Sequence, residues 1–313
     1  MIIRAAASAL PSNCYDSAAV AAWCGSDETF LRKKVGISSR HFMQEGESEL
    51  ELAASACEKL FARAGVALRD IGLCIHVGQV RTQTIPHTSA LLQHRLGLSE
   101  SCACFDMGLA CSGYIYALSV AKSFMESGNV EHGLLVTCDP YSRIMGRSNR
   151  NTVPLFGDAA TATWLSLHGT GLETGKTDLG TDGAGASYLE FPSHDSEREL
   201  HMNGRGIFNF AVRRVPESVE RCLRLNEVKK EDIDYFLFHQ ANAFMLRTLC
   251  ESMKIDEKKC PMRMEKVANT VSSSIPLLLE EFLPCFCSGQ RVIMSGFGGG
   301  LSWGTTCATF KGE

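Results

Sequence analysis

Apolar segments alternate with helical segments along this chain, and the alternation occurs twice. Leu68–Val77 (LRDIGLCIHV) runs from an acidic turn into an apolar stretch, and Lys229–His239 (KKEDIDYFLFH) repeats that pattern. Buried strands that alternate with helices of about 12–15 residues are typical of an α/β fold with largely parallel sheets. The repeat predicts two related halves, 1–167 and 168–313, which pack against each other as a pseudo-dimer.

A second pair of segments supports this repeat. Gly133–Asp139 (GLLVTCD) and Gln290–Gly296 (QRVIMSG) are both short apolar runs near a glycine-containing turn. Between the expected strands, Ser48-x-x-Glu51 forms a capping box, which marks the start of a helix. These local signals agree with the α/β prediction.

The composition excludes several classes of protein. Of the 313 residues, 45% are hydrophobic and 21% are charged, which are ordinary globular values, so extended disorder is excluded. The formal net charge is −4 and there is no long basic run, so we expect no nucleic acid partner. The sequence has no apolar stretch long enough to span a bilayer and no export-like leader. We therefore expect a protein without a membrane anchor, located in the cytoplasm.

The 14 cysteines raise the alternative of a redox-sensing or metal-binding protein. Their spacing includes Cys102-x-Cys104 and Cys285-x-Cys287, but no C-x-x-C pair of the kind found in zinc knuckles and thioredoxin-like sites. We therefore expect no metal site. Most of the thiols should be reduced core residues that pack as small hydrophobes.

Cys111 is a candidate nucleophile because of its surroundings. It lies in Asp106–Tyr114 (DMGLACSGY), where small residues crowd the thiol and an amphipathic helix follows at once. Unpaired N–H groups and the dipole at a helix N-terminus favour a thiolate. The alternative interpretation is a buried structural cysteine.

His239 and Asn269 are two further polar residues in apolar or small surroundings. His239 ends an apolar strand (FLFHQANAF), and the carboxyl end of a buried strand in an α/β fold faces the ligand crevice. Asn269 lies in VANTVSSSIP, which leads into a helix. Taken singly, the histidine is typical of a core residue and the asparagine of a capping loop. The loop Ser295–Gly304 (SGFGGGLSWG) lacks the Lys-Ser/Thr of a P-loop, and it allows the backbone to approach a reacting centre closely.

In that order along the chain, Cys111 in ACSG, His239 in HQAN, Asn269 in NTVSSSIP and the GFGGGLSWG loop resemble the ketosynthase III family. This family is the β-ketoacyl-acyl-carrier-protein synthase III-like branch of the thiolase superfamily. The resemblance runs over the full length, since Val35–His41 and Phe156–Ala160 also match segments of that family. It implies an α/β, five-layer α-β-α-β-α thiolase fold of two similar halves with mixed, mostly parallel sheets. It also implies a homodimer.

The resemblance also implies a reaction and roles for individual residues. Cys111 is the nucleophile that becomes acylated, and His239 and Asn269 bind the malonyl thioester oxygen and promote decarboxylation. The acyl thioester and the malonyl thioester condense to a β-ketoacyl product, in fatty acid initiation or in a specialised pathway. The substrates are acyl-coenzyme A and malonyl-coenzyme A or a malonyl carrier protein, and no cofactor is required. The expected oxyanion donors are backbone N–H groups at Cys111, Gly298, Gly299 and Gly300.

Several positions depart from the family pattern and leave the identity of the donor open. Where the family has a tryptophan that stacks on the coenzyme A adenine, this chain has Phe30, with Lys34 nearby. Arg150 matches a family arginine that contacts the nucleotide, and Asn242 is a further candidate for the pantetheine site. Phe244 stands where a basic residue is common. Four arginines are candidates to supply positive charge to a phosphopantetheine or an acidic carrier protein instead: Arg205, Arg213, Arg214 and Arg247.

The sequence constrains the identity of the acyl group and of the acceptor less than it constrains the fold. In the family, the residue before Pro86 reaches into the partner subunit's acyl tunnel and is often a phenylalanine. Here it is Ile85, and we hypothesise a pocket that admits chains longer or bulkier than acetyl. Two alternatives keep the fold: transfer of the acyl group to an oxygen or nitrogen acceptor, and hydrolysis. The intact pair of His239 and Asn269 favours decarboxylation.

Overall fold

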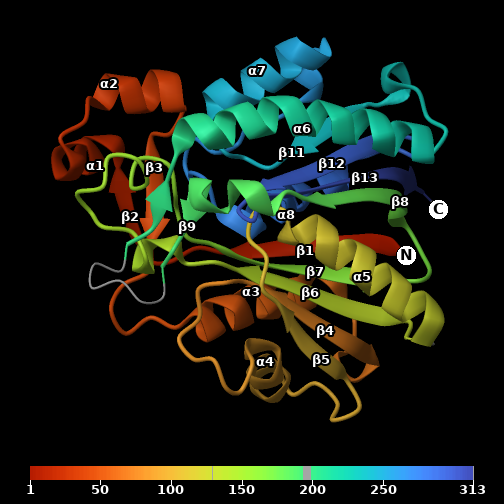
Figure 1. Cartoon of the computed structure of the whole chain (residues 1–313). Helices are drawn as coiled ribbons and strands as arrows, with labels where there is room; N and C mark the ends of the chain where they lie inside the picture. The colour runs from red at the N-terminus through yellow and green to blue at the C-terminus, as the bar shows by residue number, and fades with distance from the viewer. Residues whose placement is uncertain (129, 193–198, 313) are drawn as a thin grey trace.

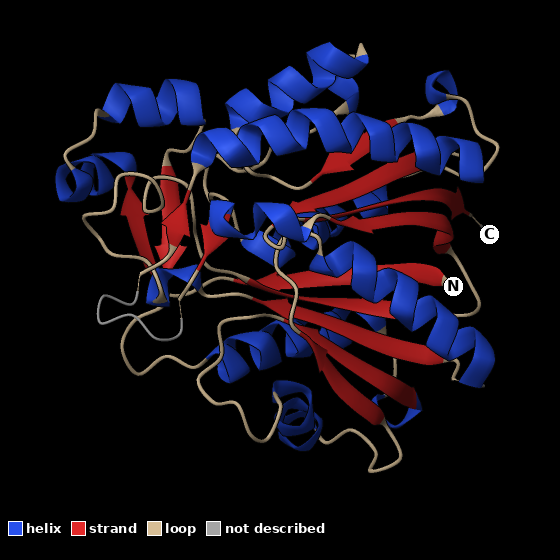
Figure 2. Ribbon diagram, viewed as in Figure 1, coloured by secondary structure: helices blue, strands red, loops and turns tan. Residues whose placement is uncertain are grey.

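The computed structural model describes residues 1–128, 130–192 and 199–312. At its centre is a mixed nine-stranded sheet, in which strands from the two halves of the chain form two groups (Figure 2). In spatial order, the C-terminal group is β11 (Tyr235–Phe238), β12 (Arg291–Gly298), β13 (Ser302–Lys311) and β8 (Gly171–Thr181). The N-terminal group continues with β1 (Ile2–Ala9), β7 (Ala160–Ser166), β6 (His132–Cys138), β4 (Ile71–Val77) and β5 (Ala103–Met107). Two smaller sheets pair β2 (Asn13–Asp16) with β3 (Ser39–Phe42) and β9 (Leu189–Glu190) with β10 (His201–Met202).

The two strand groups repeat one pattern of strand direction. β4 and β6 are parallel, and β7 and β1 follow in antiparallel order. β11 and β12 are likewise parallel, and β13 and β8 follow in antiparallel order. The same order of parallel and antiparallel pairs therefore occurs in both groups, and position 167/168, the predicted boundary, lies between β7 and β8. The mixed sheet is confirmed, but the parallel pairing is confined to β5–β4–β6 and β11–β12.

Helices form three layers around the two strand groups (Figure 1). α6 (Gly204–Leu225) and α7 (Ala243–Met253) cover the outer face of the C-terminal group, whereas α3 (Glu49–Ala64) and α4 (Thr88–Leu96) cover the outer face of the N-terminal group. α5 (Gly113–Gly128) and α8 (Ser274–Phe282) lie between the groups. The order is α-β-α-β-α, as expected. α1 (Ser17–Cys24) and α2 (Glu28–Phe30) lie to one side, next to β2 and β3.

Burial on both faces explains why the central strands are continuous apolar runs. In β11, Phe236 and Phe238 pack in the same core as α6 and α7, while Leu237 packs in the central layer with α5 and α8. The acidic turns recognised in the sequence are short helical turns, η2 (Leu68–Asp70) before β4 and η5 (Lys230–Asp232) before β11.

The cysteines belong mostly to the core. All 14 are free thiols, and those that are exposed are Cys14, Cys285 and Cys287. The expectation that most of the thiols are buried is therefore confirmed. Among the described residues, no group of three or more His, Cys, Asp or Glu side chains is arranged to hold a metal ion. Within the same ranges, no helix has both the length and the apolar character needed to cross a membrane.

Candidate active site

Cys111 lies in the tight turn between β5 and α5, two residues before the helix begins. Strand β12 of the other half passes directly against this turn. A Cβ atom at Gly296 would lie 2.6 Å from the carbonyl oxygen of Cys111, and one at Gly298 would lie 2.9 Å from its Sγ. The two glycines therefore allow a strand from the C-terminal half to approach the thiol.

The surroundings of Cys111 act on its protonation in the opposite direction to the prediction. The sequence predicts a thiolate at the helix N-terminus, but burial raises the pKa of the Cys111 thiol well above its usual range. The carboxylate of Asp139 raises this pKa further, since a negative charge disfavours the thiolate. The side chain of Cys111 is therefore a neutral thiol near pH 7.

His239 directly follows β11 and is buried. Its Nδ1 lies 2.7 Å from Oγ of Ser274, and its ring meets Phe297 edge to face, with 5.5 Å between ring centroids. Burial lowers the pKa of His239 to about 3, so the imidazole is neutral near pH 7. With Nδ1 engaged by Ser274, Nε2 is the ring nitrogen available to a ligand.

Asn269 lies in the segment that leads to η7 (Val271–Ser273) and then to α8. Its Oδ1 accepts a hydrogen bond of 2.9 Å from the backbone N–H of Val271. Its backbone is held on both sides, because its N–H donates to the carbonyl of Leu155 and its carbonyl accepts from Gly157. Since Oδ1 is occupied, the Nδ2 amide is the group that Asn269 can offer as a donor to a ligand.

A single cavity of about 70 Å³ brings these side chains together. Cys111, His239, Asn269, Asn242 and Gly298 all line it, although they come from distant parts of the sequence. Most of the other lining residues are apolar: Leu155, Phe156, Leu189, Met202, Ile207, Met245 and Phe297. The arrangement combines a thiol, a neutral imidazole and an amide donor in surroundings that strengthen electrostatic interactions.

Gly299 and Gly300, expected beside Gly298, line a neighbouring cavity of about 290 Å³ instead. Leu189 belongs to the walls of both cavities. Other residues of the second wall are Val80, Tyr141, Ile144, Phe191 and Leu200. Only Gly298 of the three glycines therefore lines the cavity that holds the thiol.

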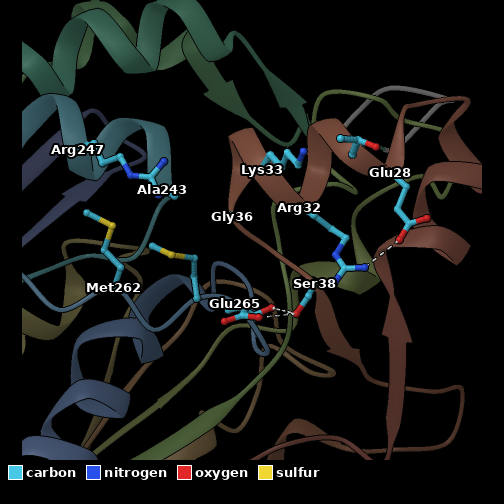
Figure 3. A pocket seen from close by; sticks show the side chains of 11 residues that line it. Glu28, Arg32, Lys33, Gly36, Ser38, Ala243, Arg247, Met262 and Glu265 are labelled. Carbon is cyan, nitrogen blue, oxygen red and sulfur yellow. Dashed lines mark hydrogen bonds and ion pairs between the residues drawn. The ribbon is translucent and has the colours of Figure 1, made fainter.

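A larger cavity, the basic cavity, has a volume of about 680 Å³ and is lined by three cationic side chains and by the carboxylates of Glu28 and Glu265 (Figure 3). Arg247 of α7 stands on one side, and Arg32 and Lys33 of η1 (Leu31–Val35) stand on the other. Gly36, with a φ of +83°, lies against Ala243 at the start of α7, and a Cβ at position 36 would lie 2.5 Å from Cβ of Ala243. A glycine at this position therefore allows η1 and α7 to lie side by side. Arg32 also contacts Glu28 at 3.4 Å.

Of the residues predicted to bind the carrier, Asn242 lines the catalytic cavity and caps α7, where its Oδ1 accepts from Met245 N–H at 2.8 Å. Phe30 (53% exposed), Lys34 and Arg150 are exposed and do not line the basic cavity. The arginine at 247 was among the expected cations, whereas Arg32 and Lys33 were missed. Their only signal in the sequence is the short basic run that contains Lys34.

Ile85 is 87% exposed and lines neither of the two cavities at the site. Two polar residues that touch the site were also missed by sequence reasoning. Ser274 lies in a serine run that reads as a capping loop, and Asp139 follows an apolar run at the carboxyl end of β6. The position at a strand end was the signal that Asp139 offered.

Known proteins are similar to this chain in sequence and in architecture. Residues 105–190 match the profile of the family described as 3-oxoacyl-[acyl-carrier-protein (ACP)] synthase III, and residues 223–310 match the profile of its C-terminal part. A β-ketoacyl-[acyl-carrier-protein] synthase III of Bacillus pumilus is 34% identical over 281 residues, 89% of this chain and 88% of that protein. One from Streptococcus pneumoniae is 33% identical over 298 residues, 90% and 91% of the two chains.

Solved structures agree with the sequence comparisons. A crystal structure of a 3-oxoacyl-(acyl-carrier-protein) synthase III matches with a TM-score of 0.94 and 34% identity over 99% of both chains. The synthase III of Thermus thermophilus matches with a TM-score of 0.92 and 29% identity over 100% of both chains. The priming β-ketosynthase of the R1128 polyketide pathway also has a TM-score of 0.92, with 26% identity over 100% of this chain and 96% of that one.

Proposed function

Since the chain belongs to the 3-oxoacyl-[acyl-carrier-protein] synthase III family, it is a condensing acyltransferase, and we propose that Cys111, His239 and Asn269 carry out its two half-reactions. The observation that supports these roles is the common cavity lined by all three side chains.

In the first half-reaction, Cys111 takes the acyl group from an acyl thioester. A bond forms between Sγ and the acyl carbon, the bond to the carrier sulfur breaks, and the thiol proton ends on the departing carrier thiol. Cys111 starts this step as a neutral thiol and ends it as a neutral thioester. Its burial favours these neutral forms over the thiolate. His239, with a pKa of about 3, is a poor proton acceptor, and acylation does not depend on it as a base. The backbone N–H groups at Cys111 and Gly298 are the candidate donors to the tetrahedral oxyanion.

In the second half-reaction, a malonyl thioester loses carbon dioxide and negative charge develops on its thioester oxygen. Nε2–H of neutral His239 and Nδ2–H of Asn269 are the donors to this oxygen. Removing one such preorganised donor typically costs about 10²–10³ in rate. The carbanion attacks the acyl carbon on Cys111, the carbon–carbon bond forms, and the Cys111 sulfur leaves and regains a proton. No cofactor takes part in this scheme.

The basic cavity supports a donor that carries phosphate. Three cations and two carboxylates line it, and Glu28 pairs with Arg32. Neither Lys33 nor Arg247 forms an ion pair in the described part of the chain, so both cations are available to a phosphate. Phosphate groups of coenzyme A, or the phosphopantetheine and acidic surface of a carrier protein, have the matching charge. We therefore assign acyl-coenzyme A or an acyl carrier protein to this cavity.

The acyl chain is proposed to be longer or bulkier than acetyl. The cavity of about 290 Å³ beside Gly299 lies next to the catalytic cavity and has several apolar wall residues. Offering acetyl-, butyryl- and octanoyl-coenzyme A separately and recording the acylation rate of Cys111 tests this. A strong preference for acetyl would refute it.

A homodimer is proposed because Ile85 stands exposed on the loop after β4, where it can reach a second copy of the chain. Light scattering coupled to size-exclusion chromatography would give twice the mass of 34.1 kDa for such a dimer. A monomer at micromolar concentration would contradict the proposal. The cytoplasm is the proposed location.

Intact-protein mass spectrometry tests the proposed roles. Cys111→Ala should lose the mass shift produced by acyl-coenzyme A. His239→Ala and Asn269→Ala should retain that shift and fail to form a malonyl-dependent product. If either variant instead blocks acylation while malonyl decarboxylation continues, the roles are assigned wrongly.

A further inference from the structure

Asp139 lies at the carboxyl end of β6, fully buried and directly beside the catalytic elements. One carboxylate oxygen, Oδ1, accepts hydrogen bonds from the backbone N–H groups of Gln79 at 2.6 Å and Val80 at 3.4 Å. The other, Oδ2, accepts from Oγ of Ser272 at 2.9 Å. A single side chain therefore connects the loop after β4 with η7 of the other half.

Each of the three serines that follow Val271 has a different partner. Ser272 binds Asp139, Ser273 Oγ lies 2.7 Å from Oγ1 of Thr137, and Ser274 binds Nδ1 of His239. η7 is thus fixed to β6 and the residue after it by Ser272 and Ser273, and Ser274, the first residue of α8, contacts His239. Since Oδ1 of Asn269 is held by the N–H of Val271, the position of η7 also sets the position of Asn269.

The charge of Asp139 acts on the thiol as well. Burial raises the pKa of Asp139 to about 6, and the hydrogen bonds from Gln79, Ser272 and Val80 act in the opposite direction. The carboxylate is therefore ionised at pH 7 and above. The titratable groups around it are His76 on β4, Cys138 on β6, Tyr141, and Cys111 itself. Tyr141, two residues after Asp139, and Val271, next to its partner Ser272, pack in one buried cluster with Cys111. Asp139 is the charged neighbour that raises the pKa of Cys111.

We propose that Asp139 is a positioning residue for both parts of the site, acting on Cys111 through its charge and on Asn269 through Ser272. Its negative charge favours the two neutral forms of the nucleophile, the thiol and the thioester, over the thiolate. Its hydrogen bond to Ser272 keeps η7, and with it the amide of Asn269, in place across the cavity. The part that concerns Asn269 rests on the proposed function, whereas the part that concerns the thiol does not.

The rate of Cys111 alkylation by iodoacetamide tests the charge effect. Asp139→Asn keeps the size of the side chain and removes its charge, and a like charge at short range shifts a pKa by about 1–3 units. Since the pKa of Cys111 lies well above the pH at which the folded protein can be assayed, the readout is the alkylation rate at a fixed pH of about 8. This rate should rise about threefold for each unit by which the pKa falls, because the tenfold gain in thiolate is offset by its lower nucleophilicity. Cys111 is identified by mass spectrometry of the labelled peptide.

Asp158→Asn is the matched control for the loss of a buried carboxylate. Asp158 is also fully buried, burial likewise raises its pKa to about 6, and it hydrogen-bonds to Met43 and Ser142 rather than to η7. The control should leave the alkylation rate of Cys111 at that pH unchanged. An unchanged rate in Asp139→Asn, or an equal rise in both variants, would overturn the charge effect.

Ser272→Ala tests the link to Asn269 without removing a charge, and it also decides the proposal if Asp139→Asn does not fold. Acylation of Cys111 should proceed at the rate of the unmodified protein, and malonyl-dependent condensation should fall about tenfold or more. Equal condensation rates in Ser272→Ala and the unmodified protein would refute the link. If no acyl-coenzyme A labels the unmodified protein, the proposed function fails, while the alkylation result still stands.

Discussion

Gly298→Ala tests how closely the two halves of the chain must approach at the thiol. An added Cβ would lie 2.8 Å from Cβ of Cys111 and 2.9 Å from its Sγ. Ordinary contacts between such atoms are about 3.5–4.0 Å, so the cysteine side chain must move by roughly 0.7–1 Å. Since a misplacement of about 1 Å at a reacting group can cost 10²-fold in rate, we expect acylation to slow by about 100-fold.

The neighbouring glycine provides the control. At Gly299 an added Cβ would meet Leu189 Cδ2 at 3.5 Å and Ala110 Cβ at 4.0 Å, which are ordinary contacts. Gly299→Ala should therefore acylate within a few-fold of the unmodified protein. The assay is the rate of the acyl mass shift on Cys111, with the melting temperature of each variant measured in parallel. Wild-type acylation by Gly298→Ala, or an equal loss in Gly299→Ala, would refute the steric argument.

Two further predictions concern His239 and the basic cavity. Because burial lowers the pKa of His239 from 6.5 to about 3, the unfolded chain binds more protons between these values, and stability falls as the pH drops below about 6.5. Between pH 7.5 and 5, the free energy of unfolding of the unmodified protein should fall by about 2 kcal/mol more than that of His239→Gln, as measured by urea unfolding. An equal fall in both proteins would contradict this. Arg247→Ala should raise KM for acyl-coenzyme A several-fold with little change in kcat, and more so at low salt, because the cation lines the basic cavity. Arg150→Ala should leave KM nearly unchanged, and the reverse order of the two effects would show that the carrier lies elsewhere.

Local signals in the sequence were sufficient for the main elements. The apolar run after each acidic turn became β4 or β11, because both faces of these strands are buried. Ser48 caps α3 as predicted, with its Oγ accepting from Leu50 N–H at 3.1 Å. The second half of the capping box did not form, since Glu51 pairs with Arg95 of α4. A tertiary partner thus replaced a local one.

The properties that the sequence did not reveal all depend on contacts between distant segments. The pKa of Cys111 follows from burial and from Asp139, neither of which is visible in the residues that adjoin the cysteine. The basic cavity forms because Gly36 lets η1 approach the first turn of α7, more than 200 residues away in the chain. Gly298 lines the catalytic cavity, whereas Gly299 and Gly300 line the cavity of about 290 Å³. Three consecutive glycines in the sequence give no sign of this difference. Such features require the packing of the two halves.

The arrangement of the two halves bears on where negative charge is favoured in the catalytic cavity, on a substrate oxygen or on the sulfur of Cys111. α5 and α8 occupy equivalent places in the central layer, after β5 in one half and after the Asn269 segment in the other. Cys111 lies two residues before α5, and Ser274, the first residue of α8, contacts His239, so both helices begin close to the catalytic cavity. The partial positive charge at their N-termini favours negative charge on a thioester or acyl oxygen placed there. Asp139 has the opposite electrostatic effect on the sulfur, because its carboxylate disfavours negative charge on Cys111. In the proposed half-reactions, the helix N-termini favour the oxyanion and the enolate, whereas Asp139 disfavours the thiolate of Cys111.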